Sequence, residues 1–189
     1  SNTFLLNAIT QFAADNPEVR LEVESMLSSD LRLALAAEQL NIAIGIAPSG
    51  EDVYLVNSAV VRPIWAMADS FQCGTDQPLP IIRHPDPCEY AERMRAAMRG
   101  SKRTWKTVLV SSDVAGIQSA LLAGLGTSAL TPATLLPGLR IGREEEGFPP
   151  LEPLRVGLFY KHARLSKAGH GLAQWLMEQI GAAGQGLGS

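Results

Sequence analysis

The order of helical and strand patterns constrains the fold of this chain more than any other feature. Near its start, apolar residues recur at helical spacing: Leu5, Leu6, Ile9 and Phe12. Residues 19–23 (VRLEV) alternate apolar and polar side chains as a strand does, and a second helix is expected to begin near Ser28. Residues 40–47 (LNIAIGIA) form a nearly continuous apolar run, typical of a strand buried on both faces of a parallel sheet. This helix–strand–helix–strand order predicts an α/β fold.

A second αβ series follows two extended stretches, residues 53–61 and 63–68, which leave no room for a helix between them. The expected elements of this series are strands at 79–83, 106–110 and 127–131 and helices at 87–99 and 113–123. Short strands are then expected near 139–141 and 154–160. The final helix carries Leu172, Trp175, Leu176 and Ile180 on one face. We expect this helix to return and pack on the first series.

Two αβ series joined by extended connections predict two Rossmann-like lobes with a central cleft. The first lobe is expected to contain residues 1–61 and 137–189, and the second residues 62–136. Ligand sites favour domain interfaces of this kind and the carboxyl ends of parallel strands.

The composition narrows the class of protein. The chain has 189 residues, is 46% hydrophobic and carries a net charge of −3, which is typical of a compact domain and argues against direct contact with nucleic acid. Cys73 and Cys88 form no CxxC motif, and the three histidines are dispersed, so we expect neither a metal nor a cofactor. No apolar run is long enough to span a bilayer and no signal peptide is evident, which favours the cytoplasm.

Several segments, in this order, resemble the effector-binding domain of LysR-type transcriptional regulators. They are FLLNAITQFAADNPEVRLEVE (4–24), SSDLRLALAAEQLNIAIG (28–45), VVRPIWAMA (60–68) and SSDVAGIQSALLAGLGTSAL (111–130). Asn41 is a departure, because the family usually has Asp there. The resemblance covers nearly the whole chain and implies a fold like that of type II periplasmic binding proteins. It also implies that the family's first strand and its N-terminal winged helix-turn-helix domain would lie upstream of Ser1.

The resemblance implies that the chain binds a small effector between its lobes and is not an enzyme. Unpaired N–H groups at helix N-termini favour anions, so a small anionic metabolite is expected. The effector would act on DNA binding through the absent N-terminal domain of a homodimer or homotetramer, with no role for a membrane.

The site residues that the resemblance implies each have a simpler structural alternative. Ser28 aligns with a position that commonly contacts effector, but Ser28 or Ser29 can equally cap a helix. Pro87, Cys88 and Glu89 open a helix at the mouth of the expected cleft, where a capping arrangement with Asp86 is the alternative. The remaining candidates are Thr3 at the first helix, Ile46 and Ala47 as an apolar wall, and Ser111 and Ser112 at a strand end.

The family's effector domains pair antiparallel, which makes the faces around Phe12, Ile117 and Leu121 the candidate dimer interface. Arg62 can pair with an acidic effector or lie on the surface. Two other functions stay open at this point. A periplasmic solute-binding protein shares the architecture, and an enzyme on the same fold is disfavoured because no acid–base pair or nucleophile stands out.

Overall fold

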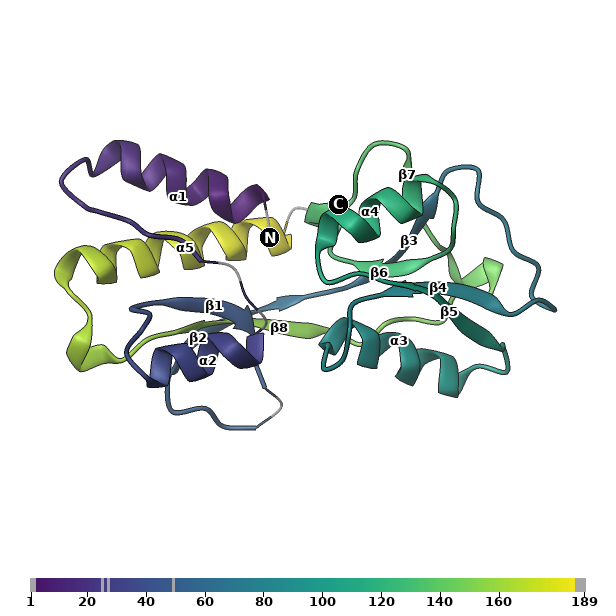
Figure 1. Ribbon diagram of the computed structural model, residues 1–189, viewed down its shortest axis with the longest axis horizontal. Coiled ribbons are helices and arrows are strands. Elements are labelled where there is room, and N and C mark those ends of the chain that lie inside the picture. Colours follow the sequence, from purple (N-terminus) through teal and green to yellow (C-terminus); the bar gives the residue numbers. More distant parts are fainter. Residues whose placement is uncertain (1–2, 25, 27, 49, 186–189) are drawn as a thin grey trace. The chain divides into compact units, whose positions relative to one another are not determined.

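The chain divides into two compact units in the computed structural model, which describes residues 3–24, 26, 28–48 and 50–185 (Figure 1). The first unit contains residues 1–61 and 154–189, and the second contains residues 62–153. The second unit begins where the extended connection was expected. It ends at residue 153 and not at the predicted residue 136.

The first unit is built from three helices and three strands. These are α1 (Thr3–Asp15), α2 (Ser28–Ala36), β1 (Ala43–Ile46), β2 (Leu55–Val61), β8 (Leu154–Phe159) and α5 (Lys167–Gln185). Strand β8 lies between β1 and β2 and runs antiparallel to both. The final helix therefore joins the first αβ series, as the sequence predicts.

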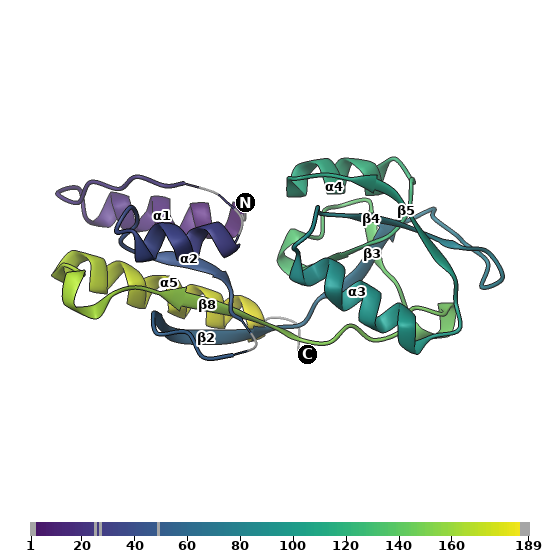
Figure 2. The ribbon, with the colours of Figure 1, turned by 60° about the horizontal axis from the view of Figure 1, so that its bottom comes forward.

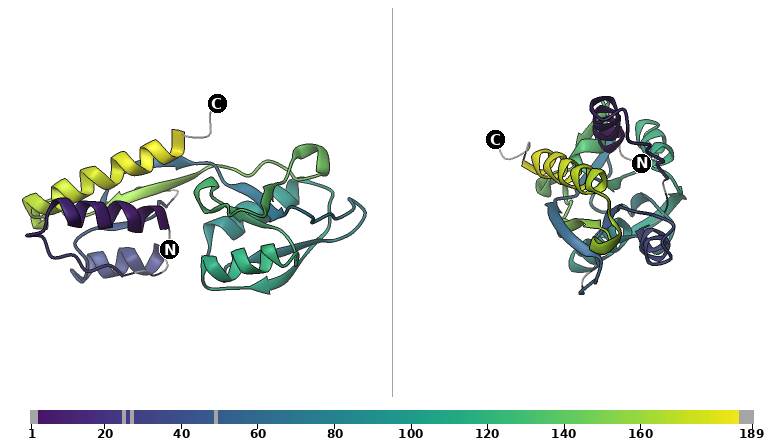
Figure 3. Two further views of the ribbon diagram at one scale, coloured as in Figure 1. Left: turned by 90° about the horizontal axis from the view of Figure 1, so that it is seen from above. Right: turned by 90° about the vertical axis from the view of Figure 1, so that its left-hand side faces the viewer.

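Alternation along the strands gives the first unit an apolar cluster on each face of its sheet. Phe159 packs with Leu35 of α2, whereas its neighbours Leu158 and Tyr160 pack with Ala173 of α5. Helix α1 runs alongside α5 (Figures 1 and 3), and the Trp175 indole N–H donates to the Ala8 carbonyl at 2.9 Å. The result is a sheet covered by helices on both faces, which is the predicted α/β class.

Two strand predictions in the first unit are wrong in part. Residues 19–23 form no strand, and Val23 is 55% exposed, because no described segment lies beside them to accept their backbone hydrogen bonds. Strand β1 does form, but its neighbour is the antiparallel β8 rather than a parallel strand. The apolar run at residues 40–47 reports burial and does not report the direction of the neighbouring strand.

The second unit contains five strands and two α-helices. These are β3 (Ile64–Ala68), β4 (Leu79–Arg83), α3 (Glu89–Gly100), β5 (Trp105–Val110), α4 (Val114–Leu122), β6 (Ser128–Leu130) and β7 (Leu139–Ile141). Strand β3 pairs antiparallel with β6 and β7, and β4 pairs parallel with β5. A parallel bridge between Ile81 and Thr127 connects the two sheets.

The core of the second unit has two apolar layers that follow the period-2 alternation of its strands. Trp65, Met67 and Ile81 pack with Met94 and Met98 of α3. Their sequence neighbours pack with α4: Ala66 and Ile82 contact the cluster that contains Ile117 and Leu121. Helices α3 and α4 accordingly lie on opposite sides of the strands (Figure 2).

Residues 137–153 belong to the second unit, which moves the predicted second boundary. Strand β7 pairs with β3, and Phe148 is buried with its ring 5.7 Å from that of Trp65. The Trp65 indole N–H also donates to the Pro149 carbonyl at 2.7 Å. Secondary-structure patterns alone indicate neither the strand partner of β7 nor these contacts of Trp65.

None of the helices in the described ranges combines the length and the apolar character that a membrane span requires.

Candidate functional site

Ser28, at the first turn of α2, is tied to the end of strand β1. Its Oγ accepts a hydrogen bond from the Ile46 backbone N–H at 3.2 Å, and Arg32 donates to the Ile46 carbonyl at 3.2 Å. Gly45 permits this close approach, because a Cβ there would lie 3.0 Å from the Ser28 Oγ. A hydroxyl has one proton as well as its lone pairs, so Ser28 can accept from Ile46 and still donate to a ligand.

Ile46 and Ala47, the predicted apolar wall, have different surroundings. The Ala47 side chain is 8% exposed and packs in the first unit's own core with Leu35 and Phe159. Ile46 is half-buried, and its backbone N–H and C=O are both taken by α2. The wall prediction is wrong for Ala47, because a strand end packed on a helix turns alternate side chains inward.

The helix start predicted at Pro87 is wrong by two residues. Helix α3 begins at Glu89 with Cys88 as its N-cap residue, and Pro87, joined to Asp86 by a cis peptide bond, lies outside the helix. The Asp86 carboxylate does not cap α3: it pairs with Arg95 at 2.5 Å and with Arg83 at 3.3 Å. Glu89 likewise pairs with Arg93 at 3.0 Å. Arginine side chains have taken both carboxylates that were expected to close a capping box.

The ion pairs around Asp86 change the protonation equilibria of this segment. The hydrogen bond from Arg95 lowers the pKa of Asp86, and the nearby charge of Arg83 acts in the same direction. The same bond raises the pKa of Arg95, which also contacts Glu92. These side chains therefore stay ionised and paired. No described side chain accepts a hydrogen bond from the first N–H groups of α3.

His84 joins the carboxyl ends of β4 and β5. Its Nδ1 lies 2.9 Å from the Ser111 carbonyl oxygen, so Nδ1 carries the proton, and the Ser111 N–H donates to the Arg83 carbonyl at 3.0 Å. Burial lowers the pKa of His84, and the bond to Ser111 opposes that effect in part. His84 is not among the site residues predicted from the sequence. Its position directly after a predicted strand was the available signal, because ligands collect at such strand ends.

The N-terminus of α4 carries its own carboxylate. Asp113 is the N-cap residue, and its Oδ1 accepts from the Gly116 N–H at 2.7 Å. The Ser111 hydroxyl donates to the Asp113 carbonyl at 3.2 Å, and a Cβ at Gly116 would overlap that hydroxyl. Ser112 is exposed. The Asp113 carboxylate thus serves as the acceptor at the start of α4, whereas no described side chain accepts from the first amides of α3.

The side chains of Thr3 and Ser29 lie outside the part of the chain that the structure describes. Phe12 is half-buried on α1. Ile117 and Leu121 are 1% and 0% exposed, because they pack inside the second unit, so the prediction that they contact a second copy is wrong. Three other side chains form the exposed face of α4: Ala115, Ser119 and Leu122.

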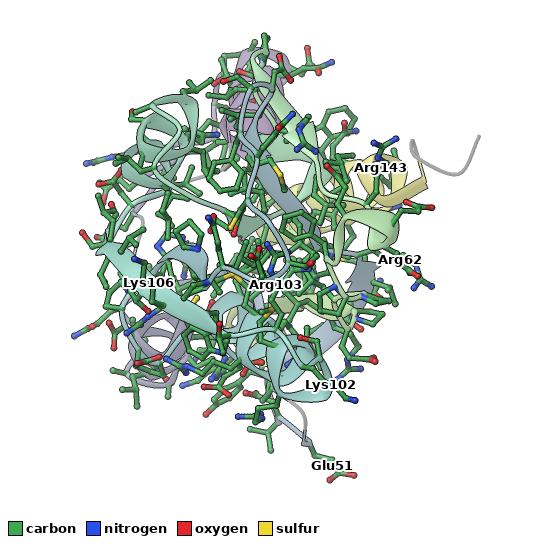
Figure 4. All side chains as sticks on the ribbon, turned by 90° about the vertical axis from the view of Figure 1, so that its right-hand side faces the viewer. Glu51, Arg62, Lys102, Arg103, Lys106 and Arg143 are labelled. Atoms are coloured by element: carbon green, nitrogen blue, oxygen red, sulfur yellow. The ribbon has the colours of Figure 1, made fainter. Side chains whose placement is uncertain are left out.

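Two arginines of the second unit have contrasting positions. Arg62 is exposed and extends from the rim of the unit in Figure 4, where Arg103 lies near the middle. Arg103 is 9% exposed and donates to the carbonyls of Cys73 at 2.9 Å and Glu146 at 3.3 Å, with its guanidinium 5.5 Å from the Phe148 ring centre. Arg103 therefore connects the backbone segments that contain Cys73 and Glu146. Across the described ranges, no three or more His, Cys, Asp or Glu side chains gather closely enough to hold a metal ion.

Comparison with known proteins gives matches over almost the whole chain. A curated relative, the HTH-type transcriptional regulator PecT of Dickeya dadantii, is 21% identical over 155 residues, which cover 82% of this chain and 48% of PecT. The chain thus spans about half the length of that relative. The regulatory domain of HypT from Salmonella typhimurium has a similar structure, with a TM-score of 0.74 at 12% identity, covering 92% of this chain and 90% of that one.

The effector binding domain of a BenM variant is also similar, with a TM-score of 0.71 at 18% identity, covering 96% of this chain and 90% of that one. At these identities the two structures establish the fold, which is that of type II periplasmic binding proteins. A family model described as the LysR substrate binding domain matches residues 1–181. The chain therefore belongs to the family of LysR substrate binding domains.

Proposed function

We propose that this chain is the effector-binding and oligomerisation domain of a LysR-type transcriptional regulator that acts in the cytoplasm and catalyses no reaction. The observation that carries the proposal is the family match over residues 1–181. PecT is named as an HTH-type regulator, and the match covers half of it, so contact with DNA would be made by a part outside the match. The comparisons do not favour the solute-binding alternative.

The effector is proposed to carry an anionic group that the start of α3 binds. The first amides of this helix have no side-chain acceptor among the described residues, and they lie at the positive end of the helix dipole. The acidic side chains of the same turn, Glu89 and Glu92, are paired with Arg93 and Arg95. The Ser28 hydroxyl of the first unit is proposed to contact effector as well, because it accepts from the Ile46 N–H and keeps a proton to donate.

Self-association is proposed to use the exposed face of α4 and the face of α1 around Phe12. Leu122, Leu125 and Leu136 of the second unit are 44%, 51% and 38% exposed. Large apolar side chains exposed in this way are typical of surfaces that contact another protein.

Thermal unfolding in the presence of single carboxylates tests the effector proposal. We would compare acetate, lactate, succinate, 2-oxoglutarate and benzoate with chloride at equal ionic strength. A ligand that binds only the folded chain stabilises it by about 2.7 kcal/mol at a hundredfold excess over its dissociation constant. At least one acid should raise the unfolding midpoint above that in chloride. Equal midpoints for all five acids would contradict the proposed binding of carboxylates.

Sedimentation velocity tests the self-association proposal. The chain is expected to form a dimer, and Leu122→Asp should shift it toward the monomer by placing a charge on the apolar face. Ala96→Asp, at an exposed position of α3, is the matched control and should leave the dimer intact. A monomer at every concentration, or equal effects of the two substitutions, would argue against the α4 face.

A further inference from the structure

Two of the three histidines of the chain lie together at the turn between β8 and α5. His162 belongs to the short helix η3 (His162–Arg164), and His170 lies in the first turns of α5. Their ring centres are 5.1 Å apart, with an interplanar angle of 41°. The Tyr160 ring contacts both, at 5.2 and 5.4 Å between centres. All three side chains belong to the first unit and take no part in the site described above.

The separation of the two rings fits coordination of one metal ion. Imidazole nitrogens bind zinc at about 2.0–2.1 Å, which places the ion about 3.2 Å from each ring centre. Two ring centres 5.1 Å apart then subtend an angle of about 105° at the ion, close to the tetrahedral value of about 109°. A shared ion therefore needs no change in the distance between the rings.

The surrounding structure fixes the backbone that carries His170 and places the Tyr160 ring against both imidazoles. Tyr160 is 8% exposed and meets the His170 ring edge-on, at 88°. The Ser166 hydroxyl accepts from the Gly169 N–H at 3.0 Å, and the Ser166 carbonyl accepts from the His170 N–H at 2.9 Å, which fixes the turn that carries His170. His162 is exposed, so an ion from solution can reach the pair. Ligands held in position before binding lose less conformational entropy when the ion arrives.

We propose that His162 and His170 form a two-imidazole site for a divalent transition-metal ion. Imidazole ligands suit Zn²⁺, Ni²⁺ and Cu²⁺, and Cu²⁺ binds most tightly of these. Water would fill the remaining coordination positions. Lys161 and Arg164 lie nearby and share the single carboxylate of Glu38, at 3.4 Å each, so the local charge is positive. This positive charge and the small number of protein ligands weaken the binding of a cation. The site therefore takes an exchangeable ion and is not a structural metal centre.

Titration of untagged protein with ZnCl₂ and CuCl₂ tests this site. Isothermal titration is expected to show one Zn²⁺ per chain and tighter binding of Cu²⁺. Because the chain has only three histidines, NMR signals of the imidazoles report each one separately. Substoichiometric Cu²⁺ should broaden the signals of His162 and His170 and leave His84 sharp. Broadening of His84 to the same extent would overturn the proposal.

Substitutions then distinguish a shared ion from two independent surface ligands. If one ion bridges the rings, His162→Gln and His170→Gln each weaken Zn²⁺ binding by about tenfold or more, and the double variant, which keeps neither imidazole, removes the binding that remains. His84→Asn is the control and should leave Zn²⁺ affinity unchanged. Unfolding midpoints measured without metal show whether a variant has lost its fold. If one has, His162→Ala is tested in its place. Single substitutions that each remove only half of the binding capacity would overturn the proposal.

Discussion

The two units share one architecture but differ in how completely their sheets are covered and in their charge. In the second unit, strands β3 and β4 lie between α3 and α4, and Ala66, Met67 and Ile82 are each 0% exposed. In the first unit, β1 ends the described sheet, and residues 19–23 have no partner strand. The first unit has nine acidic and six basic residues, whereas the second has ten of each.

This comparison separates two roles. The second unit has the balanced charge, and no described side chain accepts from its α3 amides, so it is the better place for an anionic group. The excess of acid in the first unit disfavours an anion there. The first unit instead offers a neutral donor, the Ser28 hydroxyl.

Leu121→Ala should produce the largest loss, because Leu121 is 0% exposed in the core beside α4. Truncating a buried leucine costs about 2–5 kcal/mol of unfolding free energy. Leu33→Ala, on α2 and 70% exposed, should change stability by less than about 0.5 kcal/mol. Urea unfolding of both variants measures the difference. Equal losses would mean that the assignment of Leu121 to the core is wrong.

Arg103→Ala should destabilise the chain more than Arg32→Ala, which compares buried and half-exposed arginines of the two units. Removal of Arg103 leaves the carbonyls of Cys73 and Glu146 without their donor, at a cost of about 1–3 kcal/mol for a buried acceptor. The Arg32 side chain is 30% exposed, so water can replace it at the Ile46 carbonyl and the loss should be about 1 kcal/mol or less. Chemical unfolding curves measure both. A larger loss for Arg32→Ala would contradict the comparison.

Ser28→Ala and Asp113→Ala should each cost about 1 kcal/mol, because Ser28 accepts from the Ile46 N–H at the end of β1 and Asp113 accepts from the Gly116 N–H at the start of α4. The two variants should differ in ligand binding. Ser28→Ala removes a proposed donor and should weaken binding of the carboxylate found by thermal unfolding, whereas Asp113→Ala should leave it unchanged or strengthen it. Titration calorimetry of the two variants checks this, and the reverse order would refute the role assigned to Ser28.

The smallest effect is a pH dependence from His84. Burial lowers its folded-state pKa below the ordinary 6.5, so the folded chain holds this proton less tightly than the unfolded chain does. Stability from this group is therefore fully present above pH 6.5 and is lost as pH falls through the lowered pKa. In His84→Asn the side-chain amide can still donate to Ser111 but does not titrate. The unfolding midpoint of the wild type should fall more steeply with acid than that of the variant, and parallel curves would exclude the effect.

Much of the fold can be read from the sequence, because the alternation along β3 and β4 assigns neighbouring residues to opposite layers. The strand at residues 19–23 fails because alternation does not reveal whether a neighbour exists. The capping box expected at Asp86 does not form, because the Asp86 carboxylate pairs with Arg95, nine positions later. Ile117 and Leu121 fail as interface residues because an apolar helix face looks the same whether it meets its own core or another chain. The geometry of the candidate site depends on partners that are distant in the sequence, and local patterns do not reveal them.

The most direct test of the central claim is carboxylate affinity in Glu89→Pro. Cys88 is extended, with φ −144° and ψ 122°, and the first position of a helix accepts proline, so this substitution removes one N–H of α3 and preserves the helix. Glu89→Ala is the control, because it loses the same pair with Arg93 and keeps the amide. We expect the carboxylate to bind about tenfold more weakly to Glu89→Pro than to Glu89→Ala. Equal affinity in the two variants would contradict the claim that the start of α3 binds the effector.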